Sequence, residues 1–152
     1  MDSRPSGPSP FEPERVGLIQ RPLRILVADD DRDAVLTLKM LLRHEAYDVR
    51  GVYSGDDVAK VARELRPDVI ILDITMPGMS GYELARTLRA RYGDACPVLI
   101  ALTAWDKSSD KILSEVVGFN HHFGKPVDPQ ALLQLLGTLS QKAASQNLKA
   151  GA

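Results

Sequence analysis

Short apolar runs alternate along the chain with longer segments whose apolar residues recur at helical spacing. Short runs bounded by charged residues or turn formers are typical of β-strands, and the longer amphipathic segments are typical of helices. The predicted strands cover residues 24–28, 47–52, 68–73, 97–102 and 121–123. The predicted helices cover residues 33–46, 55–67, 80–93, 107–117 and 128–143. The pattern therefore predicts five strands that alternate with five helices.

The predicted strands at 68–73 and 97–102 are apolar on both faces. This is usual where helices cover both sides of a parallel sheet, and right-handed crossovers then give an open sheet. The predicted fold class is α/β, with a doubly wound, five-stranded parallel sheet. Ligands of such sheets bind beyond the carboxyl ends of the strands, so the residues that follow each strand are candidate site residues. These are Asp29-Asp30-Asp31, Asp73-Ile74-Thr75, Thr103-Ala104-Trp105 and Lys125-Pro126.

The composition narrows the classes of function. The chain has 152 residues, 44% hydrophobic and 26% charged, which suits one globular domain with a real core. A net charge of −1 gives no basic excess, so we expect no nucleic-acid partner. The chain shows no apolar run long enough for a membrane helix and no secretory signal, and its single cysteine is compatible with a reducing compartment. We therefore expect a cytoplasmic protein without a membrane partner.

The two ends of the chain differ in composition from the part between them. Residues 1–22 contain five prolines, two glycines and three serines, a composition that disfavours packed structure. We expect them to form a flexible N-terminal arm. A single folded domain should span residues 23–143, and residues 144–152 should form a disordered C-terminal tail.

Carboxylates follow two of the predicted strands. Asp29 to Asp31 follow the first strand, and Asp73 ends the third. If these strands are neighbours, the converging carboxylates raise one another's pKa unless a cation joins them, and an all-oxygen site suits Mg²⁺. Thr103 adds a hydroxyl and Lys125 an ammonium. A phosphoryl group would bridge the metal and the lysine, and Asp73, which no structural role explains, is then the predicted nucleophile of an aspartyl phosphate.

Several segments resemble the motifs of response-regulator receiver domains, in that family's order and spacing. They are ILVADDD, DVIILDITMPGMSGYEL, PVLIALTA and GFNHHFGKPVD. Each motif alone is a weak signal, but together they are very specific. The resemblance covers roughly residues 23–140. It implies a CheY-like, flavodoxin-like (βα)5 fold with strand order 2-1-3-4-5.

The resemblance also implies a role for each acidic residue of the site. Asp73 would be the phosphoacceptor, and Asp29 and Asp30 would be the acidic pair that holds Mg²⁺. Asp30 would bind the ion directly and Asp29 partly through water. The main-chain carbonyl of Thr75 would be a further metal ligand.

The resemblance assigns the remaining residues to the phosphoryl group and to switching. Thr103 would hydrogen-bond the phosphoryl group, Lys125 would pair with it, and Pro126 would follow a cis peptide bond. The switch position three residues before the lysine is usually Tyr or Phe in the family. Here it is His122, which would add sensitivity to pH.

Other polar residues near these motifs have simpler interpretations. Asp31 and Asp33 are interpreted as charges at the start of a helix, where the helix dipole favours them. His121 and His122 are adjacent in a predicted strand and would point to opposite faces, so a zinc site is not expected.

The predicted function is that of a stand-alone phosphoacceptor in two-component signalling. A sensor histidine kinase or a histidine phosphotransfer protein would donate the phosphoryl group to Asp73, and the product would signal through contact with a downstream target protein. Such a receiver is not an enzyme, although it assists its own phosphoryl transfer and dephosphorylation. One alternative is a Mg²⁺-dependent aspartyl-phosphate phosphatase, but it needs a second aspartate where this chain has Thr75. The other is a phosphorylation-independent interaction module, which the complete set of site residues disfavours.

Overall fold

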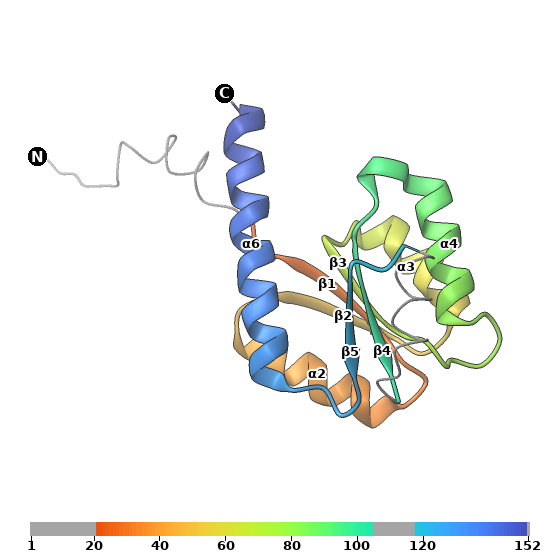
Figure 1. Ribbon diagram of the computed structural model, residues 1–152. Helices are drawn as coiled ribbons and strands as arrows, with labels where there is room; N and C mark the ends of the chain where they lie inside the picture. The colour runs from red at the N-terminus through yellow and green to blue at the C-terminus, as the bar shows by residue number, and fades with distance from the viewer. Residues whose placement is uncertain (1–20, 105–117, 152) are drawn as a thin grey trace, which may run out of the picture. The chain divides into compact units, whose positions relative to one another are not determined.

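The computed structural model describes residues 21–104 and 118–151 (Figure 1). The predicted helix at 107–117 and Trp105 lie outside the described residues. The described chain falls into two units. Leu23–Pro129 form one unit, which contains the whole sheet, and the residues from Gln130 onward belong to the other.

Five parallel strands form a single sheet in the order β2-β1-β3-β4-β5. The strands are β1 (Arg24–Ala28), β2 (Asp48–Val52), β3 (Val69–Asp73), β4 (Val98–Thr103) and β5 (His121–Gly124). The predicted α/β class, the flavodoxin-like fold and the strand order 2-1-3-4-5 are therefore confirmed. The chain leaves β1 towards β2 on one side and returns to β3 on the other, so the carboxyl ends of β1 and β3 lie at the switch point where such sheets bind ligands.

The helices largely follow the predicted segments. They are α2 (Arg32–His44), α3 (Gly55–Leu65), α4 (Gly81–Tyr92) and α6 (Pro129–Gly151), with a short 3-10 turn, η2 (Gly93–Ala95). The end of α6 was predicted at residue 143, and this prediction was wrong because residues 144–150 contain neither proline nor glycine and include good helix formers. The tail expected from residue 144 is thus helical as far as Gly151. None of the described helices combines the length and the apolar character that a membrane span requires.

Side chains of the strands alternate between the two faces of the sheet. On one face, Leu26, Ile70 and Leu99 belong to a buried cluster that includes residues of α3 and α4. The alternate residues Val27 and Ile71 are equally buried but lie outside this cluster. They face the other side of the sheet, where Figure 1 shows α2. The sheet is therefore covered on both faces, as its apolar strands predict.

Side-chain caps fix the start of two helices beside the carboxyl ends of the strands. Asp31 is the N-cap of α2, and its carboxylate accepts hydrogen bonds from the main-chain N–H groups of Asp33 and Ala34. Ser80 is the N-cap of α4 and forms a reciprocal capping box with Glu83. Asp31 thus has the structural role predicted for it, and an acid in this position satisfies main-chain donors that the helix leaves unpaired.

The start of β5 is held by an arginine of α4. The guanidinium of Arg89 donates to the carbonyl oxygen of Gly118 from Nε at 2.9 Å and from Nη2 at 2.7 Å. It also donates to Oδ1 of Asn120 at 2.7 Å, and the same oxygen accepts the main-chain N–H of Leu99 at 2.8 Å. This network sets β5 beside β4 and thereby sets the position of Lys125 at the far end of β5.

Gly81 should be intolerant of any side chain. Its N–H donates to the carbonyl oxygen of Ile74 at 2.9 Å, and a Cβ here would lie 2.7 Å from Cα of Ile74 and 3.0 Å from the carbonyl oxygen of Asp73. Main-chain atoms cannot rotate away, so we expect Gly81→Ala to lower the free energy of unfolding by about 1–3 kcal/mol. Urea unfolding would measure this.

Gly137 in α6 offers a matched control, because no atom of the described residues, apart from its chain neighbours and the backbone of its own helix, lies within 4 Å of the position that a Cβ would take. Alanine is favoured over glycine inside a helix, so Gly137→Ala should be neutral or stabilising by up to about 1 kcal/mol. If Gly81→Ala were as well tolerated as Gly137→Ala, the close approach of α4 to the end of β3 would be disproved.

Candidate functional site

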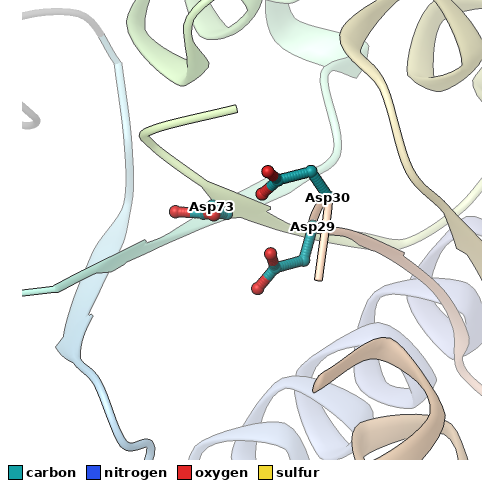
Figure 2. Close-up of side chains that lie close together, drawn as sticks. All are labelled: Asp29, Asp30 and Asp73. Atoms are coloured by element: carbon teal, nitrogen blue, oxygen red, sulfur yellow. The ribbon is translucent and has the colours of Figure 1, made fainter. Parts of the chain in front are cut away.

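The pairing of β1 with β3 brings two aspartates side by side. The register pairs Ala28 with Leu72, so the residues that follow them, Asp29 and Asp73, lie level with each other at the carboxyl edge of the sheet. Asp30 follows directly, and Figure 2 shows the three carboxylates close together. One oxygen from each of the three lies within 4.8 Å of the others. The convergence of carboxylates that the sequence predicted is therefore present.

The members of this acidic cluster (Asp29, Asp30 and Asp73) differ in burial. Asp29 and Asp73 are only 1% and 2% exposed, whereas Asp30 is exposed to solvent. Lys125 comes from the loop after β5 and bridges the two buried acids. Its Nζ lies 2.9 Å from Oδ2 of Asp29 and 3.2 Å from Oδ2 of Asp73. One ammonium thus serves two buried carboxylates, and the peptide bond that follows it, Lys125–Pro126, is cis as predicted.

The other oxygen of each buried acid bonds to its own loop. Oδ1 of Asp29 accepts the main-chain N–H of Asp31 at 3.0 Å. Oδ1 of Asp73 accepts the main-chain N–H of Thr75 at 3.1 Å and the Thr75 hydroxyl at 3.2 Å. Both carboxylates are therefore fixed in orientation, with Oδ1 towards the loop and Oδ2 towards Lys125.

The role of the Thr75 hydroxyl was not foreseen from the sequence, which assigned only the main-chain carbonyl of this residue. The signal that could have revealed it is local. An aspartate commonly accepts hydrogen bonds from the residue two positions later, and here that residue adds a hydroxyl to its N–H. Ligation of a metal by the Thr75 carbonyl stays a prediction.

Burial, hydrogen bonds and neighbouring charges shift the pKa values of Asp29 and Lys125. Burial raises the pKa of Asp29, and the nearby charge of Asp73 adds to this, while hydrogen bonds from Asp31 and Lys125 oppose it. Burial alone would lower the pKa of Lys125, but its hydrogen bond to Asp29 and the charges of Asp73 and Asp29 outweigh burial and raise it. Lys125 is thus held firmly in its charged form, whereas the ionised form of Asp29 is disfavoured.

The metal-free protein should lose stability as the pH rises through the titration of Asp29. The pKa of Asp29 in the folded protein is raised above its ordinary value of 3.8. At pH values between the ordinary and the raised pKa, the folded state therefore binds more protons than the unfolded state. The free energy of unfolding then falls with rising pH in this window. Urea unfolding without divalent metal, at a series of pH values, should show a steeper fall for the wild type than for Asp29→Asn. Equal slopes in the two proteins would contradict this attribution.

The cluster has the chemistry of a site for a hard divalent cation. With all three carboxylates ionised, the charges are −3 from the acids and +1 from Lys125, which leaves −2. Carboxylate oxygens suit Mg²⁺, which takes one or two of them and keeps several waters. The exposed Asp30 leaves one side of the cluster open to such an ion and to its water ligands.

Thr103 lies at the same edge of the sheet, whereas His122 lies farther back within β5. Thr103 is the last residue of β4, is 3% exposed, and its carbonyl oxygen accepts the N–H of Lys125 at 2.7 Å. It follows Leu102, which pairs with Asp73, so it lies at the level of the cluster. His122 is half-buried in β5 and pairs with Ala101, before the end of β4. The roles of both in binding phosphate and in switching stay predictions.

Comparison with known proteins agrees with this geometry. The family model "Response regulator receiver domain" matches residues 25–137. The DNA-binding response regulator MtrA of Mycolicibacterium paratuberculosis is 36% identical over 110 residues, which cover 72% of this chain and 48% of that protein. The chain thus spans about half the length of the curated relatives it matches.

Solved structures agree as well. A putative response regulator from Chloroflexus aurantiacus is 30% identical with a TM-score of 0.72, covering 78% of this chain and 97% of that one. The chemotaxis response regulator CheY4 of Vibrio cholerae is 26% identical with a TM-score of 0.72, covering 78% and 98%. With its strand order and its acidic cluster at the switch point, this chain belongs to the response regulator receiver domains of two-component signalling.

Proposed function

We propose that the chain accepts a phosphoryl group on Asp73 from a histidine kinase or a histidine phosphotransfer protein. The observation that carries this proposal is the setting of Asp73. Its carboxylate is buried at the switch point, lies 3.2 Å from Lys125, and is within 4.8 Å of two further acids. A buried acid in such a setting has no stabilising purpose by itself, because like charges this close repel one another.

The proposed reaction transfers the phosphoryl group between two nucleophiles. A carboxylate oxygen of Asp73 bonds to phosphorus while the bond from phosphorus to the donor imidazole nitrogen breaks. The electron pair of that bond stays on the imidazole, which is released as the neutral base or takes a proton from solvent. The hydrogen bonds from Thr75 hold the Asp73 carboxylate in a fixed orientation during attack, and positioning supplies much of the catalysis in phosphoryl transfer.

The surrounding residues have matching parts in this proposal. Mg²⁺ held by Asp29, Asp30, Asp73 and the Thr75 carbonyl would neutralise the charge of the phosphoryl oxygens. Lys125 already lies beside the Asp73 carboxylate and would pair with the new anion. The hydroxyl of Thr103 would donate to it, and the resulting movement at β4 and β5, with His122 as the switch residue, would report phosphorylation to a target protein.

Incubation with acetyl phosphate and Mg²⁺, followed by intact mass measurement and hydroxylamine treatment, tests this function. We expect one phosphoryl group per chain, labile to hydroxylamine as an acyl phosphate. An interaction module that does not use phosphate would gain no mass. A phosphatase would turn over phosphate esters continuously, yet Thr75, which lies where its acid–base carboxylate would be needed, only donates a hydroxyl to Asp73.

The exposed face of α2 supports a protein as the natural donor. Leu36 and Met40 lie one helical turn apart and are 53% and 65% exposed, on the helix that begins directly after the acidic cluster. Large apolar side chains exposed together favour a protein contact. A donor docked here would bring its phosphohistidine to the edge of the sheet that carries Asp73.

The double variant Leu36→Ser/Met40→Ser separates docking from chemistry. Transfer from a histidine kinase that phosphorylates the wild type should slow by about tenfold or more, because the apolar contact of two side chains is lost. The rate with acetyl phosphate should be unchanged, since a small donor needs no docking surface. Rapid-quench measurement of both reactions gives the comparison. Equal slowing with both donors would instead indicate damage to the site.

A further inference from the structure

A cavity lies at the opposite edge of the sheet from the acidic cluster. It has a volume of about 590 Å³ and is formed where α3 ends, α4 ends, and β3 and β4 begin. Its apolar walls include Ala62, Pro67, Tyr92 and Pro97. Because Asp73 ends the strand that begins beside this cavity, the length of β3 separates the two sites by about 15 Å. The cavity is therefore distinct from the phosphorylation site.

Two guanidinium groups give this cavity its charge. Arg63 lies in the last turn of α3, Arg66 is the C-cap residue that follows the helix, and both are exposed and line the cavity. Within residues 21–104 and 118–145, neither arginine forms an ion pair with a carboxylate. The described lining residues include no acid. The cavity is thus cationic at its mouth.

The guanidinium groups of these two arginines are not required to terminate α3. The main-chain N–H of Arg66 already donates to the carbonyl oxygen of Ala62 at 3.0 Å. The carbonyl oxygen of Leu65 accepts Nη1 of Arg24 at 3.3 Å. Because these two carbonyl oxygens already accept hydrogen bonds from a main-chain N–H and from Arg24, the guanidinium groups of Arg63 and Arg66 remain available to a ligand. Guanidinium binds carboxylate and phosphate oxygens in a paired geometry.

We propose that this cavity binds a small organic anion with a flat, apolar body and a carboxylate or phosphate group. Its volume lies within the usual range for small-molecule sites, which combine apolar walls with a few convergent polar groups. The apolar body would contact Tyr92 and the two prolines, and the anionic group would bind to Arg63 and Arg66. This inference does not depend on phosphorylation of Asp73.

A pair of probes that differ only in charge tests the proposal. We would titrate 2-naphthoate and its neutral analogue 2-naphthamide into the full chain and follow ¹H–¹⁵N NMR spectra. Naphthoate should shift the amide signals of Ala62, Tyr92 and Ala95 saturably and bind at least tenfold more tightly than naphthamide. Signals around the acidic cluster should be unaffected by either probe.

Variants test separately how the arginine charges and the cavity itself contribute to binding of the probes. Arg63→Gln/Arg66→Gln should weaken naphthoate by tenfold or more and leave naphthamide unchanged. Arg91→Gln, which removes an exposed arginine of α4 that does not line the cavity, should have no effect. Ala95 is exposed at the lining, so Ala95→Trp should block both probes without disturbing the core. Equal binding of both probes, equal loss in Arg91→Gln, or binding of an acidic peptide in place of naphthoate would overturn the proposal.

Discussion

The Asp73→Asn variant should incorporate no phosphoryl group from acetyl phosphate or from a phosphorylated kinase. The amide that replaces the carboxylate is not a nucleophile, and the loss relative to the wild type should be complete at the sensitivity of intact mass measurement. The fold should remain intact. Removal of one of three clustered carboxylates relieves repulsion in the metal-free state, so the variant should unfold at equal or higher urea concentration.

Asp31→Asn provides the matched control for this prediction. Asp31 is adjacent to the cluster in sequence, but its side chain caps α2. Asparagine is as good an N-cap as aspartate, so both stability and phosphorylation should be close to those of the wild type. A hydroxylamine-labile phosphate on Asp73→Asn would identify another carboxylate as the acceptor. Loss of phosphorylation in Asp31→Asn would show that the site extends into the helix start.

The sequence predicted those parts of the site that follow from the order of elements. Parallel strands present their carboxyl ends at one edge, so Asp29, Asp73 and Lys125 could be expected together once the alternation of strands and helices was recognised. The register then sets the match between Asp29 and Asp73, since Ala28 pairs with Leu72. Composition and spacing do not show that Lys125 would bridge both acids, because its contact with Asp29, for example, joins residues 96 positions apart.

Other features were beyond prediction because they depend on close packing between distant segments. The need for glycine at position 81 arises from main-chain atoms of Ile74 that lie close to the position a Cβ would take, which no local pattern reveals. The hold of Arg89 on Gly118 and Asn120 is likewise a contact between separate elements. The prediction of where α6 ends was wrong for a different reason, because a segment of polar and small residues is compatible with either a helix or a disordered tail.

Lys125→Ala should destabilise the metal-free protein by about 3 kcal/mol. The lysine is the cation that bridges Asp29 and Asp73, and its removal leaves two buried carboxylates to repel each other. Loss of one partner from a buried ion pair costs about 3–5 kcal/mol, and the 29% exposure of the Lys125 side chain places the expected cost at the lower end. Urea unfolding in the presence of a chelator would measure it.

Two control variants test whether the loss of stability in Lys125→Ala comes from the removed charge at this site. Lys142→Ala removes an exposed lysine of α6 and should change the free energy of unfolding by less than about 0.5 kcal/mol. The double variant Lys125→Ala/Asp29→Asn removes one of the two carboxylates that the lysine neutralises, and should recover much of the lost stability. A Lys125→Ala variant as stable as Lys142→Ala would show that the two ion pairs contribute nothing to the fold.

The single variant Lys125→Ala should respond more strongly to Mg²⁺ than the wild type does. In the wild type, Lys125 already neutralises part of the charge on Asp29 and Asp73, so a divalent cation gains less from these oxygens. Without the lysine, the full repulsion of the cluster is relieved when the ion binds, and binding to the folded state alone adds to its stability. The rise in melting temperature between chelator and saturating Mg²⁺ should therefore be larger for Lys125→Ala. An equal rise in both proteins would show that the lysine and the metal act on separate charges, and the acidic cluster would then not be the metal site.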